Sequence, residues 1–457
     1  MNKVKNIIIG FGKAGKTLAQ DLGSRGESTI LIEKDPKMYG GTCIAVACIP
    51  SKKLATLASR KRDTDDPATY YKESIQEKKV LIDQLIQANY ENVQGTENVE
   101  VIDGEASFVS ETEVKISKKD GSEQFYEADR IFINTGSTPN IPSIKGIKID
   151  GKRIHTSKTI MDDEDFPKRL TIIGDGPIGL EFASIYSQFG SKVTVISKND
   201  SGEFVNQLDK EDSQVLLETL QDMGIEFIFN ADTKEIDTTN HEELGLTYEV
   251  KGTTHEKKTD KVLVATGRRP NIEQLNLEDA GVIIAENRSI QINKRLQTNK
   301  EHIYALGDVN GGPQQTYLSL DDYRIVRSQL YGDGSYDLSK RAFIPSTFFV
   351  NPPLSTVGLS EEAAIESGFN TKVAKIPVES IPKSKILGNT VGFYKVIVDA
   401  DTNLILGAVL FGEESHEVIN IIATAMIGKL PYQVLKNQVY THPTMAEALN
   451  SLFSAIE

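Results

Sequence analysis

The two cysteines are the residues of this chain whose type and spacing point most directly to chemistry. Cys43 and Cys48 are separated by four residues, and the sequence contains no other cysteine. A disulfide between them would close so short a loop that it would restrict the unfolded chain very little, and stabilising disulfides are rare in reducing compartments. Only six histidines are present and none stands at metal-finger spacing to the pair, which argues against structural zinc. The pair is therefore predicted to be a catalytic couple.

Two glycine-rich turns lie where a strand pattern gives way to a helix pattern. One follows the apolar run Val4–Ile9 and precedes a strand pattern at Thr29–Glu33; the other follows Leu170–Ile173 and precedes Lys192–Ser197. Glycines in such units allow a tight turn and close approach to a pyrophosphate, which the helix N-terminus faces. Their glycines are Gly10, Gly12 and Gly15 in the first and Gly174, Gly176 and Gly179 in the second. Two such units in the correct context predict two dinucleotide-binding domains.

The residue at the end of the second strand of each unit indicates which ribose it can hold. Glu33 stands 23 residues after Gly10, and a carboxylate there suits the unphosphorylated adenosine ribose of FAD or NAD. The same offset from Gly174 falls on Ser197, which Lys198 follows, so a cation stands where a 2′-phosphate could bind. Lys198 can equally be a solvated turn residue. NADPH is the predicted second dinucleotide, with NADH as the alternative.

Composition limits the classes of partner. A chain of 457 residues is too long for one compact core and suggests about three domains. The formal charge of −14 argues against nucleic acid and anionic membrane surfaces. No apolar stretch approaches the roughly 18 residues that a membrane helix needs, and the run Ile7–Ile9 is too short for a signal peptide. We expect a cytoplasmic protein.

The segment Gly40–Lys52, GGTCIAVACIPSK, together with the two dinucleotide-binding units, resembles the glutathione reductase and lipoamide dehydrogenase family of flavoprotein disulfide reductases. The resemblance covers the whole chain and includes the run HPTMAE that starts at His442. It implies an α/β fold with two Rossmann-like domains and a C-terminal α+β dimerisation domain, with FAD in the first unit and NAD(P)H in the second. Further cofactor-binding residues that it implies are Gly41, Thr42, Lys52, Thr135, Gly136, Gly267 and Asp308.

The predicted domains follow from this resemblance. Residues 1–140 and 270–341 would form the two parts of the FAD-binding domain, residues 141–269 the NAD(P)H-binding domain, and residues 342–457 the interface of a homodimer. The highly charged stretch Ser59–Tyr90 is interpreted as a solvated helical excursion.

The resemblance also implies a role for each catalytic residue. Cys43 would be the interchange thiol that meets the substrate, and Cys48 would face the flavin. Lys52 would approach the flavin and pair with Glu181. His442 and Glu447 resemble the family's base and its orienting acid, supplied by the other subunit, and an imidazole there could take a proton from the Cys43 thiol.

Helix physics adds a local expectation. Cys43 follows a Gly-Gly-Thr turn and is expected at the start of a helix, where the positive end of the dipole favours a thiolate. Cys48 would lie just over one turn further along this helix, and Lys52, four residues on, would share its face.

Departures from the best-known family members narrow the substrate. Ala45 and Ala47 replace the usual asparagine and glycine between the cysteines, and there is no C-terminal cysteine pair and no N-terminal metal-binding extension. The segments Ile8–Ala19 and Gln315–Arg327, together with Tyr39, are similar to the bacterial reactive-chlorine-response reductases that act on hypothiocyanous acid, HOSCN. A small oxidant of this kind suits a dithiol, because one thiolate can be oxidised and the other can resolve the product to a disulfide.

Several alternatives stay open at this point. Within the same class, the substrate could be lipoamide, a low-molecular-weight disulfide, or a metal ion such as Cu(II) or Hg(II), although the lack of accessory cysteines counts against mercury. A different class is a flavin-binding redox sensor without catalysis, which the full set of catalytic residue types argues against. In the NAD(P)H unit, Phe204 stands where glutathione reductase-like enzymes place an arginine, which weakens the preference for NADPH.

Overall fold

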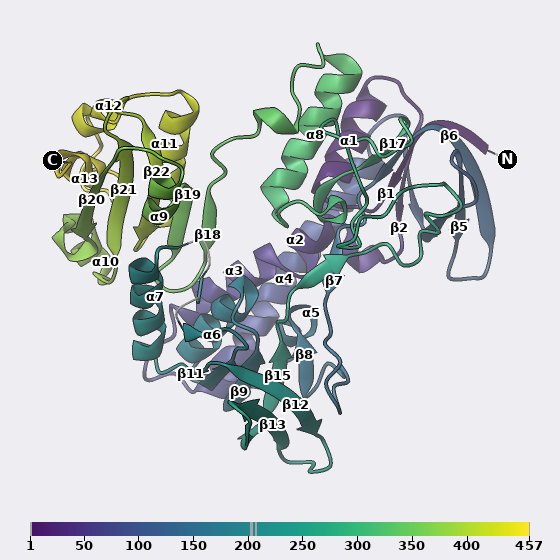
Figure 1. Cartoon of the computed structure of the whole chain (residues 1–457). Helices are drawn as coiled ribbons and strands as arrows, with labels where there is room; N and C mark the ends of the chain where they lie inside the picture. Colours follow the sequence, from purple (N-terminus) through teal and green to yellow (C-terminus); the bar gives the residue numbers. More distant parts are fainter. Residues whose placement is uncertain (1, 202–203, 206–207, 457) are drawn as a thin grey trace.

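The structure is a computed structural model that describes residues 2–201, 204–205 and 208–456. Three groups of elements can be distinguished (Figure 1): an N-terminal α/β unit, a second α/β unit from the middle of the chain, and a C-terminal unit. The fold class predicted from the sequence is confirmed, with two α/β units of dinucleotide-binding type and a C-terminal dimerisation domain.

The N-terminal unit is built on a seven-stranded sheet in the order β3-β2-β1-β6-β5-β4, with β17 also paired to β6. Its strands are β1 (Asn2–Ile9), β2 (Thr29–Glu33), β3 (Val99–Asp103), β4 (Glu105–Phe108), β5 (Glu113–Ser117), β6 (Glu123–Ile133) and β17 (Ile303–Ala305). The central strands are parallel, and Ile7, Ile8 and Ile9 are all buried. A continuous apolar run suits a strand that is covered on both faces. The helices α1 (Lys13–Ser24) and α8 (Thr316–Tyr331) pack together on one face, and the strands β4 to β6 with residues 272–290 pack on the other.

The middle unit repeats this design. A five-stranded parallel sheet has the order β11-β10-β9-β15-β8, and the helix α6 (Pro177–Phe189) follows β9. The strands are β8 (Ile154–Thr156), β9 (Arg169–Ile173), β10 (Lys192–Ile196), β11 (Glu226–Ile228) and β15 (Lys261–Val264), beside the antiparallel sheet of β12 (Ala231–Asp237), β13 (Leu244–Val250) and β14 (Thr253–Thr259). Two short antiparallel strands, β7 (Ser137–Pro139) and β16 (Arg268–Pro270), carry the chain between the two units. The boundaries predicted near residues 140 and 269 lie beside these strands, and the division into domains stays a prediction.

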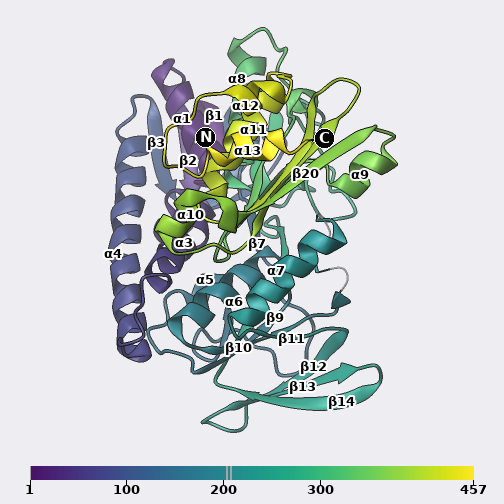
Figure 2. The same ribbon diagram turned by 90° about the vertical axis from the view of Figure 1, so that its left-hand side faces the viewer.

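The charged excursion differs from its interpretation as a solvated helix. The helix α4 begins only at Pro67 and extends to Gln94. One face is buried, with Tyr71, Ile75 and Lys78 among its buried residues. Figure 2 shows α4 running along the molecule from the N-terminal unit to the middle unit. The charges cover its outer face, while spaced apolar residues that a charge count overlooks pack against α6 and the segment that follows α5 (Ser157–Ile160).

The C-terminal unit is an antiparallel sheet in the order β18-β19-β22-β21-β20, covered by helices. Its elements are β18 (Ser346–Phe348), β19 (Leu354–Gly358), α9 (Glu361–Glu366), β20 (Thr371–Pro377), α10 (Pro382–Leu387), β21 (Phe393–Asp399), β22 (Ile405–Phe411), α11 (Ser415–Ile427), α12 (Gln433–Asn437) and α13 (Ala448–Ser454). Buried Lys395 on this sheet pairs with Asp209 at 2.8 Å and Asp212 at 3.2 Å, at the start of α7 (Lys210–Asp222) in the middle unit. The described residues contain no helix long and apolar enough to cross a membrane.

Candidate active site

A cavity of about 1510 Å³ lies where the three units meet. It extends from Glu33 and the first glycine-rich turn, past Cys43 and Cys48, to residues of the middle and C-terminal units such as Glu181 and Phe349. Ordinary ligand pockets measure roughly 300–1,000 Å³, so this volume suits an extended ligand or two ligands end to end.

The first glycine-rich turn packs so closely that it excludes side chains. Gly10 has φ +101°, and a Cβ there would stand 2.4 Å from the backbone oxygen of Asn134. A Cβ on Gly12 would be 2.3 Å from Asn134 Oδ1, and the same oxygen accepts the Gly15 N–H at 2.9 Å. Asn134 also donates to Leu306 O at 2.7 Å, so one buried amide holds the turn against β6 and β17.

Glu33 ends β2 and lines the cavity. Its carboxylate accepts the backbone N–H groups of Phe11 and Asp35, each at 3.1 Å. Burial raises its pKa, and these two backbone bonds work against that rise. The carboxylate is therefore fixed beside the turn, where it can accept the two hydroxyls of a ribose.

Asp308 follows β17, in the short helical turn Gly307–Asn310, and lines the same cavity. The side chain of Ser137 donates to Asp308 Oδ2 at 2.5 Å and accepts from Arg268 Nε at 2.8 Å. Thr135 donates to Asn271 O at 2.7 Å, and a Cβ on Gly136 or Gly267 would meet no atom within 4 Å. The glycine backbone, the fixed carboxylates of Glu33 and Asp308 and the open groove together form a site that fits a dinucleotide such as FAD.

The two cysteines lie on different helices, which corrects the sequence-based expectation of one continuous helix. The helix α2 covers Gly41–Ala45, and α3 (Cys48–Ala58) begins at the second cysteine. The break occurs because Ala47 adopts a non-helical conformation with φ −141° and ψ −97°. The positive end of the eleven-residue helix α3 therefore lies at Cys48, whereas Cys43 sits within a helix of only five residues.

The electrostatics of the pair follow this arrangement. A hydrogen bond from Cys43, a second from Thr316 and the charge of Lys52 lower the pKa of Cys48 to about 6, against the effect of burial. The Thr316 hydroxyl lies 3.6 Å from the Cys48 sulfur. The bond with Cys48 and burial raise the pKa of Cys43. In the reduced pair these contacts favour a thiolate at Cys48 over one at Cys43, which differs from the expectation that the helix start favours a thiolate at Cys43.

Lys52 and Glu181 pair as predicted from the sequence. Lys52 lies one turn after Cys48 on α3, and Glu181 lies on α6. The second carboxylate oxygen of Glu181 accepts the Phe349 N–H at 3.0 Å, and the Lys52 ammonium lies 4.6 Å from the centre of the Phe349 ring. All three residues line the cavity and join the three units at one point.

The second glycine-rich turn is packed in the same way as the first, but Ser197 stands in the position that corresponds to Glu33. A Cβ on Gly174 would be 2.5 Å from Ala265 O and one on Gly179 2.1 Å from Gly174 O, while one on Gly176 would face open space. Ser197 is buried, and its hydroxyl donates to Asp175 Oδ2 at 2.7 Å. Lys198 is exposed and pairs with Asp232 at 2.6 Å. Phe204 is buried and packs edge-on to Phe227 and Phe229.

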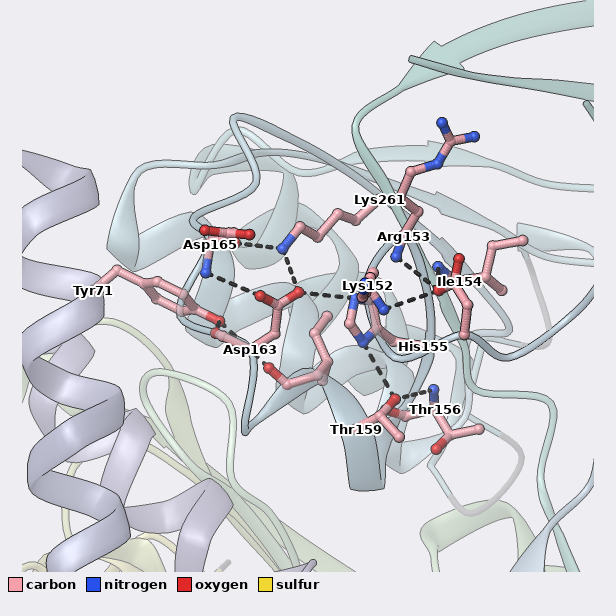
Figure 3. A network of polar contacts seen from close by, with 12 residues as sticks. Tyr71, Lys152, Arg153, Ile154, His155, Thr156, Thr159, Asp163, Asp165 and Lys261 are labelled. Carbon is pink, nitrogen blue, oxygen red and sulfur yellow. Dashed lines mark hydrogen bonds and ion pairs between the residues drawn. The ribbon is translucent and has the colours of Figure 1, made fainter. Parts of the chain in front are cut away.

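A buried polar network lies around α5 in the middle unit (Figure 3). Asp163 lies 3.1 Å from His155 Nε2 and also pairs with Lys261, and the Tyr71 hydroxyl donates to Asp163 O at 3.0 Å. The network joins residues just before and just after α5 in the chain, and Ser157 and Lys158 of α5 line the cavity. It ties α4 to the sheet of the middle unit.

His442 lies apart from the cavity of its own chain. Its Nδ1 is 2.8 Å from Glu447 Oε2, and 71% of its side chain is exposed. Because an ionised carboxylate only accepts hydrogen bonds, Nδ1 is the donor to Glu447, and Nε2 remains available for proton transfer. The structure thus brings together Cys43, Cys48, Lys52 and Glu181, and leaves His442 with Glu447 on the surface.

Four residues of the site, Asn134, Arg268, Thr316 and Phe349, were not predicted from the sequence. Three of them lie in or next to a motif that the sequence displays: Asn134 precedes Thr135-Gly136, Arg268 follows Gly267, and Thr316 belongs to the segment Gln315–Arg327. Their side chains matter through contacts with segments far away along the chain, which no local pattern encodes.

Almost the whole chain matches a known protein family. Residues 4–322 match the pyridine nucleotide-disulphide oxidoreductase family, and residues 344–453 match the dimerisation domain of the same family.

Individual relatives agree with this. The chain is 39% identical over 457 residues to the probable pyridine nucleotide-disulfide oxidoreductase RclA of Escherichia coli, covering all of both chains. It is 32% identical to a mercuric reductase of Lysinibacillus sphaericus, with 97% of this chain and 81% of that protein covered, and 30% identical to dihydrolipoyl dehydrogenase of Bacillus subtilis, with 97% and 96% covered. A solved copper(II) complex of the HOCl-induced flavoprotein disulfide reductase RclA from E. coli superposes with a TM-score of 0.94 at 38% identity, with full coverage of both chains. The chain therefore belongs to the pyridine nucleotide-disulphide oxidoreductases and is a flavoprotein disulfide oxidoreductase.

Proposed function

We propose that the protein uses NAD(P)H and FAD to keep the Cys43–Cys48 pair reduced and that the pair reduces a small oxidant, hypothiocyanous acid. The observation that carries this proposal is the environment of the pair. Cys48 has a lowered pKa and lies at the N-terminus of α3, in a cavity that continues from the first dinucleotide turn to the Lys52–Glu181 pair. This environment supports electron transfer through the pair rather than redox sensing alone.

FAD would be held by the glycine turn at Gly10, Gly12 and Gly15, by Glu33 at its adenosine ribose and by Asp308 on its ribityl side. Gly41, Thr42, Lys52, Thr135 and Gly136 line the same groove. When bound, the flavin supplies the two-electron link between NAD(P)H and the disulfide. NAD(P)H would occupy the turn of Gly174, Gly176 and Gly179, with Ser197, Lys198 and Gly267 beside it.

The reaction of the reduced pair with HOSCN balances without any further reagent. The Cys43 thiolate attacks the sulfur of HOSCN, an S–S bond forms, the S–O bond breaks, and the leaving hydroxide takes a proton from protonated His442 to give water. The Cys48 thiolate then attacks the Cys43 sulfur, which forms the disulfide and releases thiocyanate. His442 would come from the partner subunit of a homodimer, since within its own chain it lies outside the cavity.

A small oxidant is favoured over a bulky disulfide by the full-length similarity to a reductase described as HOCl-induced. The test is stopped-flow mixing of the anaerobically reduced holoenzyme with HOSCN, oxidised lipoamide or glutathione disulfide. We expect HOSCN to reoxidise the enzyme at least about 10²-fold faster than either disulfide, because a positioned acid and thiolate act on it together. Faster reoxidation by lipoamide would reassign the enzyme to the dehydrogenases that it also resembles.

Copper(II) reduction is the second candidate, because a structure at 38% identity was solved as a copper(II) complex. Among the described residues, no group of three or more histidines, cysteines, aspartates or glutamates could hold a metal ion. A copper site would therefore depend on the cysteine pair itself or on the subunit interface. Reoxidation by Cu(II) that exceeds the rate with HOSCN would favour this candidate.

We expect the purified protein to carry one tightly bound FAD per chain. Acid release of the flavin followed by chromatography measures it. Gly12→Val is expected to lose most of the flavin, because its Cβ would meet Asn134 Oδ1 at 2.3 Å and push apart the turn that faces the pyrophosphate. Recovery of FMN, or a full complement of FAD in Gly12→Val, would contradict this assignment.

We expect NADPH to be used in preference to NADH, with the difference dependent on Lys198. Lys198→Ala is expected to lower kcat/KM for NADPH by about tenfold, the scale of one lost charge contact, and to leave NADH unchanged. Asp232→Asn releases Lys198 from its ion pair and is expected to act in the opposite direction. Steady-state kinetics with both coenzymes measure this, and a strong preference for NADH that survives Lys198→Ala would refute the assignment.

The protein is proposed to act in the cytoplasm, as an oxidant-removing homodimer without nucleic-acid or membrane partners. The dimerisation domain supports the homodimer.

A further inference from the structure

A buried lysine near the first cysteine has no role in the function described so far. Lys16 lies on α1 and is 8% exposed. It is not among the residues that line the cavity, and within the described part of the chain no carboxylate forms an ion pair with it. A buried ammonium without a counterion is costly, so its position calls for an explanation.

The neighbours of Lys16 fix where its charge lies. Its ammonium donates to Asn89 Oδ1 on α4. The amide nitrogen of Asn89 donates to Leu85 O at 2.7 Å, which holds the amide with its oxygen toward the lysine. Asn89 packs against the turn before α2, since a Cβ on Gly40 would stand 3.2 Å from Asn89 Cγ.

The same turn leads directly into α2, which contains Cys43. A Cβ on Gly41 would lie 2.8 Å from Gly12 Cα, so α2 begins in contact with the N-terminus of the helix that carries Lys16. Cys43 follows two residues later. Burial and, after it, the charge of Lys13 lower the pKa of Lys16 to about 8, while the charge of an ionised Cys43 opposes that shift. In return, Lys16 lowers the pKa of Cys43 against the larger effects of Cys48 and burial.

We propose that Lys16 is a positioning residue whose buried ammonium serves as the counterion of the Cys43 thiolate and sets how readily this sulfur attacks an oxidised substrate. The inference rests on the proposed function, in which Cys43 is the thiol that meets the substrate.

The arrangement gives each thiol its own lysine. The charge of Lys52 favours a thiolate at Cys48, but Lys52 is also paired with Glu181. Lys16 has only a neutral amide as its hydrogen-bond partner among the described residues, so more of its charge remains to act on Cys43. In the reduced pair, which shares one proton, Lys16 raises the fraction of molecules in which Cys43 is the thiolate.

The test compares the NAD(P)H-reduced holoenzyme with its Lys16→Met and Lys16→Gln variants. The rate at which iodoacetamide alkylates Cys43, read by peptide mass spectrometry from pH 5 to 9, reports its thiolate fraction. Because Lys16 affects which sulfur of the pair carries the negative charge, loss of its charge is expected to lower the rate at neutral pH about tenfold, while the midpoint, which belongs to the pair, should move little. Lys16→Arg, which keeps the charge, should restore most of the rate. Flavin reduction by NAD(P)H should not change in any variant.

Lys78→Met is the matched control. Lys78, on α4, is more deeply buried than Lys16, and its partner Asp162 is exposed, so its removal leaves no buried charge behind. Its alkylation profile is expected to equal that of the wild type. A wild-type rate in either neutral Lys16 variant, or an equal loss of rate in Lys16→Arg, would overturn the inference while leaving the proposed function intact. Alkylation confined to Cys48 at every pH in the wild type would show that Cys43 is not the thiol open to a substrate and would overturn the proposed roles of the thiols as well.

Discussion

Replacing Cys48 with serine is expected to abolish turnover and, with it, the long-wavelength charge-transfer absorbance that anaerobic NAD(P)H produces in the holoenzyme. Cys48 is the thiol with the lowered pKa, at the N-terminus of α3 and hydrogen-bonded to Thr316, and we assign it the place beside the flavin. A serine hydroxyl at this position is not ionised and cannot form a disulfide. The expected loss of turnover is on the order of 10⁴-fold or more, the scale of removing a covalent nucleophile.

Cys43→Ser is the matched control for this assignment. It also stops turnover, but it leaves Cys48 as an unpaired thiolate, so the absorbance should be present without any reductant. Both spectra are recorded on holoenzyme with a full flavin complement. Exchanged behaviour of the two variants would show that the roles of the two cysteines are reversed.

The same absorbance should depend on pH in the reduced wild-type enzyme. The pKa of Cys48 is lowered to about 6. The thiolate is therefore present above this value and is protonated as the pH falls through it. Spectral titration should give a midpoint near 6. A midpoint close to 8.5, the ordinary value for a thiol, would mean that the contacts with Cys43, Thr316 and Lys52 do not act on Cys48.

The parts of the fold that could be predicted from the sequence are those with a local physical cause. The turns at Gly10 and Gly174 are visible because the positive φ and the contacts below 3 Å require glycine at fixed offsets between a strand and a helix. The Lys52–Glu181 pair was predicted by resemblance to the family. The burial of α4 was missed because its apolar residues are diluted among charged ones.

The break between the two cysteine helices has a local cause that was overlooked. Pro50 has no backbone N–H, and within one continuous helix its ring would collide with the carbonyl of Val46, whereas it is tolerated in the first turn of α3. Alanine by itself favours a continuous helix, so the position of the break at Ala47 carries no mark of its own. The burial of Lys16 was hidden in the sequence, since a lysine in a helix is normally solvated and its burial depends on Asn89, 73 residues away.

Removing the imidazole of His442 is expected to slow substrate reduction by roughly 10²-fold or more, the usual contribution of a positioned general acid–base. Glu447 holds Nδ1 at 2.8 Å and leaves Nε2 to exchange a proton with the Cys43 sulfur or the leaving group. Reduction of the flavin by NAD(P)H should be nearly unchanged, because that half-reaction needs neither residue. Single-turnover measurements of the two half-reactions separate these effects, and an equal loss in both would indicate a structural role for His442.

Because His442 lies outside the cavity of its own chain, a subunit-exchange experiment can test whether it acts on the cysteines of another subunit. In its own chain it is 71% exposed and does not line the cavity that holds the cysteines, so it must reach the pair from another subunit if it is the acid–base. A two-fold interface through the C-terminal sheet and helices would create two equivalent sites. Mixing inactive Cys43→Ser with inactive His442→Ala under conditions of subunit exchange should then restore activity, since half-exchanged dimers contain one site with both functional residues. The expected recovery is up to about one quarter of wild-type activity per chain, because half of the dimers are mixed and each mixed dimer has one intact site of two. No recovery despite proven exchange, or full activity in a monomer at assay concentration, would place the acid–base within a single chain.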